Sequence, residues 1–192
     1  MTTDKDFKRL VRGRSDRTGE SYSAARRRLL KRRGQRVPIP NLRRVEKPEY
    51  GFSIEVPEDW PEEPPDLNNS QYEVARFRYY DADARRLTLV SRPTDDAEPQ
   101  VWTAANAVRG RRQRTGFMHF SLAECEWGGG DGVRIDCDKP SDRPRGVWTI
   151  REYLAVANGV VYILGMGTSQ PIDDGPLFDE IATRFEVFAA DR

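Results

Sequence analysis

Arginine and lysine side chains crowd one short stretch near the start of the chain. Between Arg17 and Arg36, eight of the twenty residues are basic, and six of the eight lie within 26–33. A guanidinium group stays charged at physiological pH and can bind a carboxylate or phosphate through two parallel hydrogen bonds. On a helix, like charges four residues apart repel one another, and an anionic partner relieves that repulsion. We therefore expect this stretch to bind an anionic macromolecule.

The same stretch would also present a narrow apolar seam. If it is helical, Tyr22 and Leu29 anchor that seam while the basic side chains cover most of the remaining circumference. It lacks the interleaved aromatic platform on which single-stranded nucleic acid stacks, which favours an acidic protein surface as partner and leaves nucleic acid, or a ribosome, as the alternative. The predicted partner-binding residues are Tyr22, Arg26, Arg27, Arg28, Leu29, Lys31, Arg32 and Arg33.

The charges are distributed unevenly along the chain. The net charge of +1 conceals 16 Lys or Arg against 5 Asp or Glu in residues 1–47, and 16 against 26 in residues 48–192. A basic arm thus precedes an acidic body. Such asymmetry is typical of a protein with a partner of opposite sign, or of an arm that lies on its own body.

Nucleophilic catalysis has little support in the sequence. His119 is the single histidine, so a Ser-His-Asp or Cys-His site would have to use it. Cys125 lies six residues further along the same predicted strand, about 20 Å away at ~3.3 Å per residue. A disulfide between Cys125 and Cys137 stays open, although a domain of this size does not need one.

Metal and nucleotide motifs are also missing. Two cysteines and one histidine form no CxxC or HxxxH pair, and the glycine-rich WGGGDG lacks a phosphate-binding frame. The acidic residues of the body could offer a carboxylate pair for hydrolysis, but nothing in the sequence singles one out. We expect no catalytic residues, no metal and no cofactor, with a hydrolase of unidentified carboxylate site as the remaining alternative.

Two helices are expected in the arm. Apolar residues at i, i+3 and i+4 predict a first helix over 4–12, a break follows over 14–19, and a second helix begins near Ser21 and stops at Gly34. Too few large apolar residues are present for this pair to fold alone. We divide the chain into a basic helical arm (1–33), an extended linker (34–45) and an α+β domain (46–192).

Two further helices are expected in the body. The first carries Trp102, Ala105 and Val108 on its inner face. Its last turns hold Arg109, Arg111, Arg112 and Arg114, which would meet the negative end of the helix, extend a basic surface, or pair with the acidic loops PEEPPD and TDDAE. The second would begin at Asp174 as cap, with Pro176 in its first turn.

The remaining pattern of the body is that of strands. Apolar residues alternate in YGFSIEVPEDW, and Asn158-Gly159 between two apolar runs predicts a hairpin with a type I′ turn. The predicted order β-β-β-α-β-β-β-β-α, without βαβ alternation, indicates an antiparallel sheet in an α+β sandwich.

The segments YGFSIEVPEDW, REYLAVANGVVYILGMGTS and GPLFDEIATRF resemble those of the PsbP-like superfamily, over roughly residues 46–188. That resemblance implies a central antiparallel sheet sandwiched by helices, and a role in docking on other proteins. The arm, with Thr18-Gly19-Glu20-Ser21-Tyr22 followed by Ala25-Arg26-Arg27, is similar to a short module that precedes varied bacterial domains. That second resemblance implies an address or docking tag.

These patterns predict a non-enzymatic binding or adaptor protein. The first residues contain no apolar run typical of a signal peptide, and no stretch of 18 apolar residues could cross a membrane. We therefore expect a cytoplasmic protein without a membrane partner. The preference for arginine over lysine is typical of a GC-rich bacterial genome.

Overall fold

The chain folds into two compact units. The computed structural model describes residues 4–18, 29, 40–79, 85–94, 100–140, 147–169 and 171–189. The first unit comprises residues 1–38 and 140–147, and the second comprises residues 39–139 and 148–192.

The first unit contains helix α1, Asp4–Thr18, on which Val11 is fully buried. The predicted helix over 4–12 is confirmed, but the predicted break is wrong for residues 14–18. No proline interrupts this stretch, and Gly13 inside the helix costs only about 1 kcal/mol relative to alanine. The predicted second helix lies outside the described residues, except for Leu29, which is helical.

Seven strands of the second unit form one sheet, in the order β3-β4-β5-β9-β8-β7-β6. Pairs β3–β4, β4–β5, β5–β9, β6–β7 and β8–β9 are antiparallel, as predicted. The strands are β3 (Glu62–Glu63), β4 (Glu73–Tyr79), β5 (Arg85–Pro93), β6 (Met118–Trp127), β7 (Gly130–Pro140), β8 (Val147–Ala157) and β9 (Val160–Thr168).

The predicted hairpin joins β8 to β9. Asn158 and Gly159 have φ angles of 52° and 72°, so both turn residues adopt the left-handed conformation that a type I′ turn requires. Ala157 then pairs with Val160, and the ladder continues to Thr149 and Thr168. This turn fixes which side chains of the hairpin face each side of the sheet.

A smaller sheet has the order β1-β2-β10, with β2 (Phe52–Pro57) between β1 (Leu42–Lys47) and β10 (Glu186–Val187). A 3₁₀ turn, η1 (Pro48–Tyr50), links the first two strands. Residues 42–45, which we predicted to be linker, therefore lie in a strand. β1 contributes only Val45 to the core, and apart from the half-buried Leu42 its other side chains are charged, a pattern of edge strands that weakens the alternation signal.

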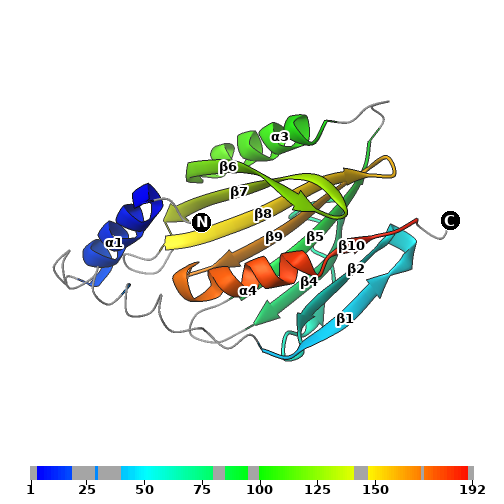
Figure 1. The fold of residues 1–192 in the computed structure, drawn as a ribbon, viewed down its shortest axis with the longest axis horizontal. Coiled ribbons are helices and arrows are strands. Elements are labelled where there is room, and N and C mark those ends of the chain that lie inside the picture. Colours follow the sequence, from blue (N-terminus) through cyan, green and yellow to red (C-terminus); the bar gives the residue numbers. More distant parts are fainter. Residues whose placement is uncertain are drawn as a thin grey trace. The chain divides into compact units, whose positions relative to one another are not determined.

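Helices α3 (Val101–Arg114) and α4 (Pro171–Thr183) lie on either side of the large sheet (Figure 1), and each covers one of two apolar layers. On one face, helix α3 packs Ala105 and Val108 against β7, β8 and β9. On the other face, helix α4 and β2 cover Tyr153, Tyr162 and other buried residues of the same strands. Neighbouring residues of β8 and β9 thus enter opposite layers, and the predicted α+β sandwich is confirmed.

Both body helices depart from prediction in detail. Trp102 is 39% exposed instead of facing inward, because at about 100° per residue it lies at the margin of the stripe formed by Val101, Ala105 and Val108. Helix α4 begins at Pro171, so Asp174 is not its cap. Asp174 is instead buried and accepts a hydrogen bond from the Thr168 hydroxyl.

Pro176 consequently lies inside α4, in its second turn, and not in the first turn as predicted. Proline is suited to the first position of a helix because its missing N–H would be unpaired there, and Pro171 occupies that position. The apolar stripe of α4 includes Ile181, which is fully buried, and continues to Phe185 just after the helix.

Candidate binding site

The predicted partner-binding residues lie almost entirely outside the described residues. Leu29 is the exception, and its side chain is 1% exposed. That these residues contact a partner stays a prediction. The positions outside the described residues are Tyr22, Arg26, Arg27, Arg28, Lys31, Arg32 and Arg33.

The histidine and both cysteines occupy positions without nucleophilic character. The exposed ring of His119 lies 2.8 Å from Asp138 through its Nδ1. Both cysteines are free, and burial raises the pKa of the Cys137 thiol to about 12, with Glu152 adding to the effect. Burial also raises the pKa of Cys125. Since the thiolate is the nucleophile, neither cysteine is activated.

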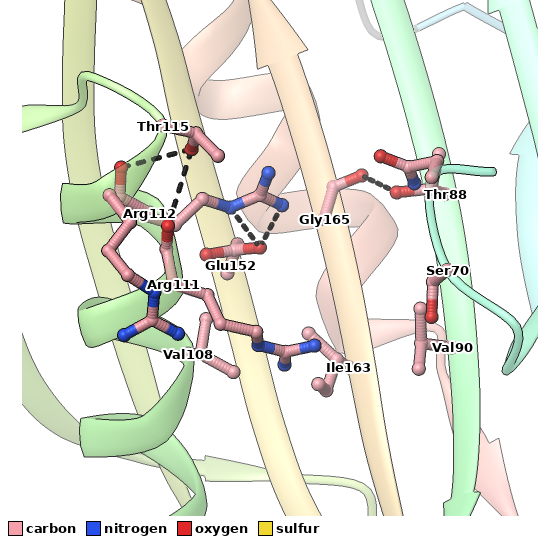
Figure 2. A pocket seen from close by; sticks show the side chains of 12 residues that line it. Ser70, Thr88, Val90, Val108, Arg111, Arg112, Thr115, Glu152, Ile163 and Gly165 are labelled. Carbon is pink, nitrogen blue, oxygen red and sulfur yellow. Dashed lines mark hydrogen bonds and ion pairs between the residues drawn. The ribbon is translucent and has the colours of Figure 1, made fainter.

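A cavity of about 280 Å³ opens between α3 and the large sheet. Its wall on the helix side comes from the last turns of α3, and its floor comes from β5, β8 and β9 (Figure 2). The loop before β4 closes one side with Asn69 and Ser70. The lining residues are Asn69, Ser70, Thr88, Val90, Val108, Arg111, Arg112, Arg114, Thr115, Glu152, Ile163 and Gly165.

A buried carboxylate lies in this cavity. Glu152 of β8 is 2% exposed, and its Oε1 accepts hydrogen bonds from Arg112 Nε at 3.1 Å and Nη2 at 2.5 Å (Figure 2). Its other oxygen, Oε2, is buried and has no hydrogen-bond partner among the described residues. Burial disfavours the charge of Arg112, but attraction to Glu152 and their hydrogen bonds outweigh it and raise the pKa of Arg112.

Two further arginines line the cavity without a carboxylate partner. Neither Arg111 nor Arg114 forms an ion pair with a described residue, and both are exposed. Burial of part of the side chain lowers the pKa of Arg111, and repulsion from Arg112 and Arg92 adds to this against the attraction of Glu152. A guanidinium remains charged despite such a shift.

The empty space depends on a glycine in β9. A Cβ atom at Gly165 would lie 3.2 Å from Thr88 Oγ1 and 3.7 Å from Glu152 Oε1. Any side chain there would press on Thr88 and fill the space beside the carboxylate. Val90, Val108 and Ile163 complete the lining with apolar surface. The cavity therefore combines a cationic wall, one buried acceptor and an apolar wall.

Glu152 is not among the residues predicted from the sequence. The arginines of α3 were expected to meet the helix dipole or acidic loops, whereas Arg112 pairs across to β8. One signal was present, because the segment TIREYLAV places a glutamate within an otherwise largely apolar strand. A charged residue on the buried face of a strand needs a partner, and the four arginines of α3 were candidates.

The described residues hold no group of three or more His, Cys, Asp or Glu side chains arranged to bind a metal ion. Among the same residues, no helix is both long and apolar enough to cross a membrane. These two findings concern only the described parts of the chain.

No model of a known protein family matches the sequence, and no curated protein matches it significantly. Solved structures do match. Cyanobacterial PsbP (CyanoP) from Synechocystis sp. PCC 6803 is 13% identical with a TM-score of 0.57, covering 80% of this chain and 96% of its own.

Two other similar structures are the Ran-binding protein Mog1p from Saccharomyces cerevisiae and LpqN, involved in cell envelope biogenesis of Mycobacterium tuberculosis. Mog1p is 12% identical with a TM-score of 0.54, covering 79% of this chain and 97% of its own. LpqN is 15% identical with a TM-score of 0.50, covering 77% and 91%. At such identities the likeness concerns the fold, and the body of this protein has the PsbP-like fold.

Proposed function

We propose that this protein is a non-enzymatic, cytoplasmic binding protein that docks on an acidic protein surface through its basic arm, residues 1–33. The observation that carries the proposal is the charge separation, with a strong basic excess in residues 1–47 and an acidic excess in the remainder. Clustered like charges favour association with a surface of opposite sign and accelerate the encounter.

The fold is compatible with such a role. Mog1p, whose fold is similar, is a Ran-binding protein, so a body of this architecture serves protein recognition in at least one case. The described residues of this chain also offer no activated thiol, since burial raises the pKa of both cysteines. Both points support binding over catalysis.

Because Leu29 is buried, the proposed contacts of the arm are mainly electrostatic. With that side chain covered, the partner would be bound by Arg26, Arg27, Arg28, Lys31, Arg32 and Arg33, with Tyr22 as the remaining aromatic contact. Binding should then weaken as salt concentration rises, because exposed charges are screened over about 8–10 Å at physiological ionic strength.

The test uses full-length protein and two fluorescent probes, a polyglutamate peptide and a double-stranded DNA. Fluorescence anisotropy at several salt concentrations should show polyglutamate binding that is lost when the six basic residues at 26, 27, 28, 31, 32 and 33 are changed to glutamine. The matched control changes the five arginines among them to lysine, which keeps the charge, and should retain most of the binding.

Two results would count against the proposal. If the glutamine variant binds polyglutamate as the wild type does, the arm is only a solubilising segment. If DNA binds more tightly than polyglutamate, with a log–log salt slope of about −0.9 per neutralised phosphate, the nucleic-acid alternative replaces the protein partner.

A further inference from the structure

Arg111 carries a positive charge that no described carboxylate neutralises. It lies in the last turn of α3, lines the cavity and forms no ion pair with a described residue. Among the described residues of the lining, Glu152 is the single carboxylate, and Arg112 already binds it through hydrogen bonds of 3.1 and 2.5 Å. Partial burial lowers the pKa of Arg111, and repulsion from neighbouring arginines adds to this effect against the attraction of Glu152. An anion that enters the cavity would relieve this repulsion.

The cavity is a positively charged site in a body with an acidic excess. Three arginines and one glutamate are the charged residues among the described ones that line it, which leaves an excess of two positive charges. Residues 48–192 as a whole hold 16 Lys or Arg against 26 Asp or Glu. A cleft lined by one sign of charge concentrates ions of the opposite sign, so we expect the occupant to carry about two negative charges.

The positions of the arginines indicate which anion fits. Arg111 and Arg114 are three residues apart on α3, so their Cβ atoms are neighbours at roughly 5–6 Å. Two guanidinium groups so close can share one tetrahedral group with several oxygens. A phosphate monoester offers three such oxygens and carries a charge of about −1.5 to −2 near pH 7. A carboxylate offers two oxygens and a single charge, so the phosphate group matches the excess better.

The size of the cavity and its apolar wall, formed by Val90, Val108 and Ile163, define the rest of the ligand. A volume of about 280 Å³ is near the lower end of the volumes of small-molecule sites, about 300–1,000 Å³. The apolar wall offers surface to a short carbon chain, which inorganic phosphate lacks. Both properties favour a small organic phosphate over free phosphate and over a compound as large as a nucleotide.

We propose that this cavity binds a small organic phosphate monoester. Its phosphate group pairs with Arg111 and Arg114, and its carbon chain lies against the apolar wall. Glu152 does not contact the ligand and instead holds Arg112 in place through Oε1. This site lies within the body and is independent of the docking function proposed for the arm.

The experiment compares three anions that differ in charge or in carbon chain. Full-length ¹⁵N-labelled protein is titrated at about pH 7.5 with propyl phosphate, with propanesulfonate and with inorganic phosphate, while amide shifts are followed by NMR. The sulfonate has the same chain and three terminal oxygens but one charge less, so propyl phosphate should bind about fivefold or more tightly. It should also bind about threefold or more tightly than inorganic phosphate, because its chain buries apolar surface. The saturable shifts should map to residues 111–115, β5 and β9.

Matched variants locate the phosphate group. Arg111→Gln and Arg114→Gln should each weaken binding of propyl phosphate about fivefold or more, since each removes one guanidinium from the cavity. Arg109→Gln removes the same charge from the same helix, but Arg109 does not line the cavity. This control should bind within about twofold of the wild type, because solvent and salt screen a charge outside the site. Arg111 and Arg114 form no ion pair with a described residue, so their replacement should leave the fold intact, which the NMR spectrum itself reports.

Several outcomes would overturn the proposal. Equal affinities for propyl phosphate and the sulfonate would mean that the excess charge does not select the ligand. Inorganic phosphate binding as tightly as propyl phosphate would assign the cavity to free phosphate. An equal loss in Arg109→Gln and in Arg111→Gln would indicate a general attraction of anions to the end of α3. Shifts outside the cavity, unchanged binding in both Arg111→Gln and Arg114→Gln, or no saturable binding of propyl phosphate would each show that the cavity is not the site.

Discussion

Glu73 and Glu152 are both buried carboxylates paired with an arginine of the body, yet they are satisfied to different degrees. Glu73 accepts four hydrogen bonds. Its Oε1 takes Arg76 Nε at 2.6 Å and the backbone amide of Asp66 at 3.0 Å, and its Oε2 takes Arg76 Nη2 at 2.9 Å and the Asn69 amide at 2.6 Å. Glu152 fills only one of its oxygens.

The two arginines, Arg76 and Arg112, also differ in burial and in their number of acidic partners. Arg76 is 4% exposed and also lies 3.4 Å from Asp66, so the pair around Glu73 is closed. Arg112 is half-buried at the rim of a cavity that two further arginines line. A closed pair of this kind fixes the local backbone, because removing either partner leaves an uncompensated buried charge. In the pair around Glu152, one carboxylate oxygen is left without a partner among the described residues.

The largest expected effect comes from Glu73→Gln. Its amide group would direct N–H donors at Arg76 or Asn69, which are themselves donors, and the buried arginine would lose its counter-charge. We expect a loss of about 3 kcal/mol in the free energy of unfolding, measured by urea denaturation. A loss below about 1 kcal/mol would show that the Glu73–Arg76 pair contributes little to the free energy of unfolding. The two buried glutamates would then not differ in their effect on stability.

The second largest expected effect is that of low pH, which should reduce the stabilisation that the Glu73–Arg76 pair contributes. Burial opposes the charge of Glu73, but the hydrogen bonds from Arg76, from the Asp66 amide and from Asn69 prevail and lower its pKa below the ordinary 4.5. The folded state therefore binds its proton less readily than the unfolded state. The resulting stabilisation is complete above about pH 4.5 and is lost as the pH falls through the lowered pKa.

Urea denaturation between pH 7 and pH 3 measures this loss. The difference in unfolding free energy between wild type and Glu73→Gln should shrink as the pH falls, since glutamine does not titrate. A constant difference over that range would mean that Glu73 is not held ionised by its partners.

The same substitution at the open pair should cost far less. In Glu152→Gln, the amide oxygen can keep the hydrogen bonds of Arg112 while the NH₂ group takes the place of Oε2, where no donor of the described residues opposes it. We expect a change of about 1 kcal/mol or less in urea denaturation. A cost equal to that of Glu73→Gln would make the two pairs equivalent and would indicate a purely structural role for Glu152.

The smallest expected effect on stability is that of Gly165→Ala. The added methyl group would lie 3.2 Å from Thr88 Oγ1, a side chain that can shift, so the thermal midpoint should change by only a few degrees. The same methyl group would lie 3.7 Å from Glu152 Oε1 and would reduce the space beside that carboxylate. A thermal midpoint far below that of the wild type would show that Thr88 does not move aside.

Local patterns predicted those parts of the fold that local interactions determine. Asn158-Gly159 sets a type I′ turn because both residues tolerate positive φ, and the structure has that turn. The start of α4 was missed because Asp174, which looks like a cap in sequence, is used instead by Thr168 of the neighbouring strand. Strand β1 was missed because an edge strand with a single buried residue, Val45, leaves almost no alternation.

The sequence by itself determined the charge asymmetry, the order of most elements and the antiparallel sandwich, because composition and hydrophobic spacing act over a few residues at a time. Only the tertiary structure decided that Arg112 reaches Glu152, forty residues away along the chain, and that Gly165 leaves space beside them. The same holds for the burial of Leu29. The hydrophobic periodicity of a sequence predicts which face of a helix or strand is apolar, but it does not predict which other element covers that face. The partner of a buried charge is therefore decided when the layers pack.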